Sequence, residues 1–341
     1  MDPATHTLFS FALSRAGAHR LTRGATALLI VSGVAADLDL LSYFAGPNGF
    51  YRVHGTLLHS VVGSAALALA IAGLAMLLDR RWAQQRGSSA APAPLRFSGV
   101  LAVCAIGCAG HLLLDFFADD PIRLDWPFRS RWSCLNFVPA FDLWIFLLLL
   151  AGALLPTLFR LIGEEIGERK TVTRISKGAV AALLLVAAVI GWRGWMHHRA
   201  EQLLFSREYR GTAPVGAAAF PEITSPLEWR GVVATDDTLD TLIVSFAPGS
   251  VIDPDRSVRE YKPDPSAALE VAEHTSVVKL FSAYAQFPAA SLQQADDGYR
   301  LVLRDLRYSS DVHGFPHLIA VVDLDTQLRV TRQELRFARR P

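Results

Sequence analysis

Histidine and aspartate residues recur at regular spacings in the apolar N-terminal part of the chain. His111 and Asp115 are four residues apart, so a helix presents both side chains on one face. An imidazole nitrogen and a carboxylate oxygen on one helix face can together bind a divalent metal ion. The same pair also suits an interhelical hydrogen bond, so its meaning depends on the other ionisable residues nearby.

Several further ionisable residues lie within or beside apolar segments. Such groups cost several kcal/mol when they are left unpaired in a membrane, and they usually mark a site. We predict that the metal ligands are His6, Asp37, Asp39, His54, His59, His111 and Asp115. Mixed His/Asp ligation favours zinc, with manganese as the alternative, and the pattern leaves the number of ions open.

Spacing sets conditions on some of these ligands. Asp37 and Asp39 are two residues apart and point about 200° from each other on a regular helix. Both can serve only if the helix frays there, or if one of them supports a ligand instead of binding the metal. His54 has to lie in a loop before the helix that follows His59. An unliganded carboxylate, Asp37 or Asp142, can act as general base. Asp142 equally suits a carboxylate that begins a helix, where the helix dipole favours it.

Apolar runs over 24–45, 56–78, 97–118, 137–159 and 176–196 provide the elements that must position these residues. Each run is close to the roughly 20 residues that a helix needs to cross a bilayer, and we predict five transmembrane helices. Thr7–Ala18 is apolar but shorter, which favours a re-entrant or half-buried helix. The composition agrees, with 51% hydrophobic and 19% charged residues and a mean hydropathy of +0.29.

Basic residues between the apolar runs predict the orientation. Three clusters fall on one side of the membrane, which the positive-inside rule makes cytoplasmic: Arg15, Arg20 and Arg23; Arg80, Arg81, Arg86 and Arg96; and Arg160, Arg169, Lys170, Arg174 and Lys177. The predicted ligands from Asp37 to Asp115, together with Asp142, then all lie toward the extracytoplasmic face. His6 joins them if the N-terminal helix runs down from that face. The orientation is predicted from the basic residues alone and uses none of these His and Asp residues. Their location toward one face is therefore independent support for a site.

The sequence after Trp195 is mixed in character and predicts a soluble domain. Alternating apolar patterns predict strands at Leu227–Ala234, Thr241–Phe246, Tyr299–Tyr308, His317–Asp323 and Leu328–Phe337, and Ala267–Phe287 is predicted as a helix. We therefore predict a transmembrane metal-site domain over 1–196 and an extracytoplasmic α+β domain with an antiparallel sheet over 197–341. The net charge of +1 lacks the excess of basic residues that is typical of nucleic-acid-binding proteins, so no nucleic-acid partner is expected.

An arginine-rich and aromatic segment lies between the third and fourth predicted spans. Arg123, Arg129 and Arg131 alternate there with Trp126, Phe128 and Trp132. Aromatic residues at this depth form an interfacial belt by default. The alternative is that these arginines bind an anionic head group of the substrate, because guanidinium binds phosphate through two parallel hydrogen bonds.

The motifs Met1-Asp2-Pro3-Ala4-Thr5-His6-Thr7, Ala36-Asp37-Leu38-Asp39, His54-Gly55, Leu58-His59-Ser60 and Gly110-His111-Leu112-Leu113-Leu114-Asp115 together resemble the YdjM-like membrane-bound metal-dependent hydrolases. Pro121-Ile122, Trp126-Pro127-Phe128 and Asp142 extend the resemblance over about residues 1–150. The spacing between His54 and His59 departs from the usual family pattern. More distantly, the succession of His, Asp, His and HxxxD is similar to the zinc phospholipase C and single-strand nuclease superfamily.

These resemblances imply a membrane-embedded hydrolase of the cytoplasmic (inner) membrane in which a metal-activated water cleaves a phosphoester. A site at the bilayer edge favours a lipid or lipid-linked substrate. Two other classes remain open. A transporter of ions or small molecules predicts polar groups that continue through the membrane, whereas a membrane-anchored binding protein with a structural metal predicts that the C-terminal domain binds a partner unaided.

Overall fold

The computed structural model describes residues 1–86, 94–165, 175–295, 297–308 and 317–338. The chain divides into two compact units. The first combines Met1–Leu41 with Val53–Arg193, and the second combines Ser42–Arg52 with Gly194–Pro341. Helix α7 (Lys177–Phe205) continues from the first unit into the second. Arg169, Lys170 and Arg174 of the third basic cluster lie outside the described residues.

Four helical segments among the described residues are long and apolar enough to cross a membrane. The first, Ala25–Val53, consists of α2 (Ala25–Val34), a 3₁₀ helix (Ala35–Ala45) and α3 (Gly46–Val53), and the others are α4 (Val61–Arg86), α5 (Phe97–Phe117) and α7. The fifth predicted span falls on α6 (Leu143–Glu165) and is not confirmed. Among the residues that the structure describes, its apolar stretch Leu143–Pro156 is shorter than the four spans.

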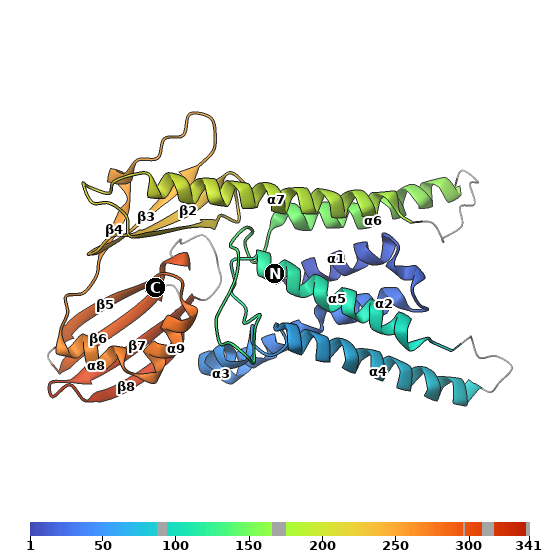
Figure 1. Ribbon diagram of the computed structural model, residues 1–341, viewed down its shortest axis with the longest axis horizontal. Helices are drawn as coiled ribbons and strands as arrows, with labels where there is room; N and C mark the ends of the chain where they lie inside the picture. Colours follow the sequence, from blue (N-terminus) through green and yellow to red (C-terminus); the bar gives the residue numbers. More distant parts are fainter. Residues whose placement is uncertain (87–93, 166–174, 296, 309–316, 339–341) are drawn as a thin grey trace. The chain divides into compact units, whose positions relative to one another are not determined.

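Helix α1 (Pro3–Arg15) is the predicted short N-terminal helix. The side chain of Asp2 caps it by accepting hydrogen bonds from the amides of Ala4 and Thr5, and Pro3 occupies the first turn, where no N–H is needed. One face of α1 buries His6, Ser10 and Ser14 in the first unit. Figure 1 shows α1 beside α2 and α5, the pairs that also make close contacts in the structure.

Small residues allow α1, α2 and α5 to approach closely. A Cβ atom on Gly33 would lie 2.0 Å from Ser10 Oγ, and one on Gly107 would lie 2.9 Å from the carbonyl oxygen of Leu29. Gly110 is packed in the same way against the ring of Phe9. Small residues are typical of such helix contacts in membranes, because they bring the backbones together. This close packing places the His111 turn of α5 against the end of α2.

The second unit contains two four-stranded sheets in which every neighbouring pair is antiparallel. The first sheet comprises β1 (Gly216–Pro221), β2 (Glu228–Ala234), β3 (Thr238–Ser245) and β4 (Val258–Tyr261). The second comprises β5 (Pro288–Ala295), β6 (Gly298–Asp305), β7 (His317–Asp325) and β8 (Val330–Ala338). An antiparallel α+β domain was predicted, but as one sheet, and β1, β4 and β5 were missed.

The single helix predicted over Ala267–Phe287 is wrong. The chain forms two short helices there, α8 (Ala267–Glu273) and α9 (Ser276–Tyr284), which pack against β7 (Figure 1). Thr275 ends the continuity because its side chain accepts a hydrogen bond from the amide of Val278 and caps α9. Ala285 is extended and leads into β5, so the helical pattern stops before Phe287.

The segment Ser42–Arg52 belongs to the second unit although it lies between two predicted ligands in sequence. The ring of Tyr43 stacks on Phe337 of β8 with 4.9 Å between centroids. Tyr51 packs edge-on against Tyr284 of α9 at 4.5 Å. Aromatic pairs at these separations contribute about 0.5–1.5 kcal/mol beyond the area they bury. The segment Ser42–Arg52 therefore packs within the second unit, which sequence periodicity did not predict.

Replacing Gly107 with alanine should separate α2 from α5. The new methyl group meets the Leu29 carbonyl, which is backbone and cannot move aside, so we expect a loss of about 1–3 kcal/mol and weaker metal binding. Thermal unfolding in detergent and metal content measure both effects. Gly73→Ala on α4 is the control, since nothing lies within 4 Å of its added Cβ. Equal stability of the two variants would contradict the packing argument.

Candidate metal centre

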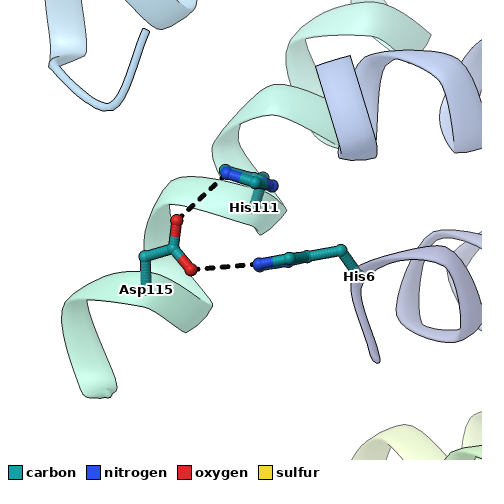
Figure 2. A group of neighbouring side chains, drawn as sticks. All are labelled: His6, His111 and Asp115. Carbon is teal, nitrogen blue, oxygen red and sulfur yellow. Dashed lines mark hydrogen bonds and ion pairs between the residues drawn. The ribbon is translucent and has the colours of Figure 1, made fainter. Parts of the chain in front are cut away.

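Helix α5 places His111 and Asp115 on one face, and both side chains are buried. Figure 2 shows the Asp115 carboxylate with one oxygen toward His111 and the other toward His6 of α1. The distance from Oδ2 to His111 Nε2 is 3.0 Å, and that from Oδ1 to His6 Nε2 is also 3.0 Å. The rings of His6 and His111 stack with 3.9 Å between centroids. Residues from the two helices thus converge on one carboxylate.

His59 completes a triangle of donor atoms with this pair. Its Nε2 lies 3.1 Å from His111 Nε2 and 3.3 Å from Asp115 Oδ2. In a tetrahedral zinc site with bonds of about 2.0–2.1 Å, neighbouring ligand atoms are about 3.3 Å apart. The three donor atoms therefore already have nearly the separation that one zinc ion imposes on its ligands.

The positions of protons on the rings favour a cation over a simple hydrogen-bond network. His111 Nδ1 lies 2.9 Å from the Gly33 carbonyl and must donate to it, so in the neutral ring Nε2 carries a lone pair. That lone pair faces Asp115 Oδ2, a buried oxygen without a hydrogen-bond partner. Buried lone pairs that face each other are costly unless a cation lies between them. The residues present therefore fit a divalent metal ion.

Asp39 contacts the Nδ1 atoms of both His59 and His54. Its Oδ2 lies 3.0 Å from His59 Nδ1 and accepts a hydrogen bond from the Gly55 amide, while Oδ1 lies 2.8 Å from His54 Nδ1. Carboxylates that contact the far nitrogen of a metal-binding histidine fix its ring orientation. This geometry favours a supporting role for Asp39 over direct ligation.

His54 faces a carboxylate with each ring nitrogen, because its Nε2 also lies 3.6 Å from Asp120 Oδ2. Burial alone would lower the pKa of His54, but the hydrogen bonds with Asp120 and Asp39 outweigh it and raise the pKa to about 10. The structure thus places His54 as a bridge between Asp39 and Asp120. Its predicted role as a ligand stays a prediction.

Asp37 is buried, and its Oδ2 lies 4.0 Å from His111 Nδ1 without a hydrogen-bond partner. The 3₁₀ helix over Ala35–Ala45 is the irregularity that the spacing of Asp37 and Asp39 required, and both side chains are buried in it. Two groups of residues have ligand atoms close enough together to hold a metal ion. One group is His6, His111 and Asp115, and the other is Asp37, His59 and His111. They share His111, whose Nδ1 donates to the Gly33 carbonyl, so its Nε2 can bind an ion in only one of the two groups.

Asp142 caps the start of α6 with its side chain. Its Oδ1 accepts hydrogen bonds from the amides of Trp144 and Ile145, and its Oδ2 lies 3.1 Å from the buried guanidinium of Arg193 on α7. This arrangement matches the helix-start alternative. The catalytic role predicted for Asp142 gains no support from these contacts.

A family model described as YdjM inner membrane protein matches residues 1–200. The chain belongs to the YdjM inner membrane protein family. Family membership and the four apolar helices identify an integral membrane protein. No curated protein and no solved structure matches the chain.

In this YdjM family member, the three predicted head-group arginines differ in their surroundings. Arg123 lies with its guanidinium 4.5 Å from the ring centroid of Trp132, whereas Arg129 and Arg131 are exposed. Burial lowers the pKa of Arg123 from its usual value. The amide of Arg123 donates to the Gly55 carbonyl at 2.7 Å, which ties its loop to the residue after His54. Arg123 is thus the arginine fixed nearest to the cluster along the backbone.

Three contributors to the site of this family member were not predicted. The Gly33 carbonyl orients His111, and Asp120 contacts His54. The α-amino group of Met1 contacts Asp115. Backbone groups carry no residue-type signal. Asp120 lies in the acidic pair that follows α5 in the sequence, and a search for carboxylates beside the histidines would have found it.

Replacing Asp39 with asparagine should weaken metal binding by about 10–100-fold without abolishing it, because His59 loses its orienting carboxylate while the ligand atoms remain. Zinc titration of the purified protein against a chromogenic chelator measures this. Asp79→Asn on α4 is the control, since Asp79 pairs with the partly exposed Arg23. A complete loss of binding would instead make Asp39 a ligand, and unchanged affinity would remove it from the site.

Proposed function

We propose that this protein is a membrane-embedded, metal-dependent hydrolase that cleaves a phosphoester of a lipid or lipid-linked substrate. The observation that carries the proposal is the buried triangle of His59 Nε2, His111 Nε2 and Asp115 Oδ2, with separations of 3.0–3.3 Å. Membership of the YdjM inner membrane protein family supports a membrane location for residues 1–200 and names no reaction.

Zinc is the ion that this donor set favours. His6, His59, His111 and Asp115 would hold it, and Asp37 would join if a second ion binds. A bound divalent ion supplies a Lewis acid that lowers the pKa of water and polarises the scissile phosphoryl group. The Gly33 carbonyl and Asp39 keep the two imidazoles turned toward the ion, so the ligands need no rearrangement to bind it.

Asp37 is the proposed general base. Its Oδ2 is buried and has no hydrogen-bond partner, and it lies 4.0 Å from His111 within the same cluster. An oxygen in that position can accept the proton of an attacking water. Asp142 is proposed to position α6 and α7 instead, because its carboxylate contacts both helices.

An anionic lipid substrate is supported by the loop after α5. Arg123 belongs to it and is tied through its amide to Gly55, beside His54. A hollow of about 360 Å³ lies on this loop and the start of α4, lined by the apolar residues Val61, Val62, Leu124, Trp126 and Phe128 together with Asp125 and Arg129. The apolar surface of this hollow and its one guanidinium, that of Arg129, suit a molecule with a phosphate head group and an acyl chain. The proposal also includes α6 as a fifth span and an extracytoplasmic site.

Replacing Asp115 with alanine should abolish both bound metal and turnover, because one carboxylate serves three imidazoles. Metal analysis of the purified protein and release of phosphate-containing head groups from mixed phospholipid vesicles provide the two measurements. Asp237→Ala, an exposed position in the second unit, is the control. Turnover that persists after complete loss of metal would refute the mechanism, and metal binding without hydrolysis of any ester would favour a transporter or a structural site.

Replacing Arg123 with lysine should raise KM about tenfold, which is the loss expected for one charge-assisted hydrogen bond, and leave metal content unchanged. Lysine keeps the charge but cannot form two parallel bonds to a phosphate. The vesicle assay gives kcat and KM separately. Arg96→Lys, at the opposite end of α5, is the matched control. An unchanged KM would remove Arg123 from substrate binding.

A further inference from the structure

The arrangement of His111 and Asp115 recurs on α7, outside the site described above. His197 and Glu201 are also four residues apart, and His197 Nε2 lies 3.3 Å from Glu201 Oε1. His197 Nδ1 lies 3.0 Å from the carbonyl oxygen of Ala219 in β1, to which it must donate. Each pair thus combines a histidine anchored to a carbonyl with a carboxylate one turn later.

A second imidazole faces the same carboxylate. His198 Nδ1 lies 3.7 Å from Glu201 Oε2, so each oxygen of Glu201 faces one ring. One ligand atom from each of the three residues lies within 4.8 Å of the other two. The spacing of i, i+1 and i+4 produces this geometry because Glu201 lies between the two histidines around the helix.

The ring of His197 is anchored through Nδ1, so Nε2 is the nitrogen that faces Glu201. Because Nδ1 of His197 donates to Ala219, Nε2 carries a proton only when the ring is an imidazolium ion. In the neutral ring, a lone pair on Nε2 faces a carboxylate oxygen. The cation between them is then either a proton or a metal ion, and His198 provides a further nitrogen that a metal ion can use and a single proton cannot.

The surroundings hold the first ligand rigidly and leave the others accessible. His197 is 5% exposed, and its ring packs against the fully buried Trp229 with 5.6 Å between centroids. On the same helix, Met196, Ala200 and Leu204 are buried in the core of the second unit. The side chain of His198 is 67% exposed and that of Glu201 is 29% exposed, so an ion can reach the group from solvent.

We infer that His197, His198 and Glu201 form a second divalent-metal site, of the class that binds zinc, with its remaining coordination position open to solvent. Two nitrogen ligands and one carboxylate oxygen are the donor set of open zinc sites. A metal ion there links α7 to β1, because the Ala219 carbonyl that orients His197 belongs to that strand. The site lies within the second unit and does not depend on the proposed hydrolase activity.

Zinc titration of the full-length protein in detergent tests this site. The Asp115→Ala background removes a central ligand of the first centre, and the titration is carried out at pH 8. In this background we expect about one equivalent of zinc to bind. Adding His198→Ala, at an exposed position, should weaken that binding at least tenfold, and Glu201→Gln should do the same. His274→Ala, an exposed histidine on the same unit, should have no effect.

Two outcomes would overturn the inference. One is a background variant that binds no zinc, and the other is unchanged affinity after His198→Ala and Glu201→Gln, which would leave an ordinary ion pair at the end of α7. If Asp115→Ala fails to fold, the otherwise unaltered chain gives the same comparison, with His198→Ala lowering zinc stoichiometry by about one equivalent. Loss of hydrolysis alone affects only the first centre, so the two proposals fail independently.

Discussion

The buried carboxylate of Asp115 is the constraint on which the first unit depends. A carboxylate removed from water between apolar helices carries a cost of several kcal/mol. Imidazoles from three separate parts of the chain offset this cost. They belong to His6, His59 and His111, and each has a nitrogen within 3.3 Å of an Asp115 carboxylate oxygen. None of these residues could be moved alone, because α1, α5 and the turn before α4 each contribute one imidazole to the same oxygen pair.

The fold serves this convergence in two ways. Glycines at the contacts of α1, α2 and α5 bring backbone close to backbone, which allows the Gly33 carbonyl to orient His111. The chain between Asp39 and His54 then leaves the helical bundle and packs through Tyr43 and Tyr51 on the C-terminal domain. The histidines are therefore oriented by backbone and by a supporting carboxylate, an arrangement typical of sites that hold metal.

The residue types at the centre could be predicted from sequence because ionisable groups are conspicuous among apolar ones. His111 and Asp115 follow from helical spacing alone, and the irregular helix around Asp37 and Asp39 follows from their separation by two residues. What sequence could not provide is the division of roles. Asp39 and His54 carry the same side chains as the proposed ligands, and only their contacts with His59, Gly55 and Asp120 favour supporting roles.

The C-terminal domain shows where local patterns fail. Alternation of apolar and polar residues predicted the longer strands but not β1, because its Gly-Ala-Ala-Ala start has little alternation. The helical periodicity of Ala267–Phe287 continues across Thr275, so it did not indicate the helix cap there. His197 and His198 lie just past the last predicted span, and their residue types alone do not mark a site. His197 gained meaning only from the Ala219 carbonyl on a distant strand, a backbone partner that no residue type marks.

X-ray absorption spectroscopy at the zinc edge of the purified, zinc-loaded protein tests the central claim most directly. We expect nitrogen and oxygen neighbours of the zinc ion at about 2.0–2.1 Å. We also expect the multiple-scattering signal of coordinated imidazoles, and this signal should decrease when His59 or His111 is replaced by alanine. A spectrum without imidazole scattering, or one unchanged in both variants, would contradict a centre built from these histidines around Asp115.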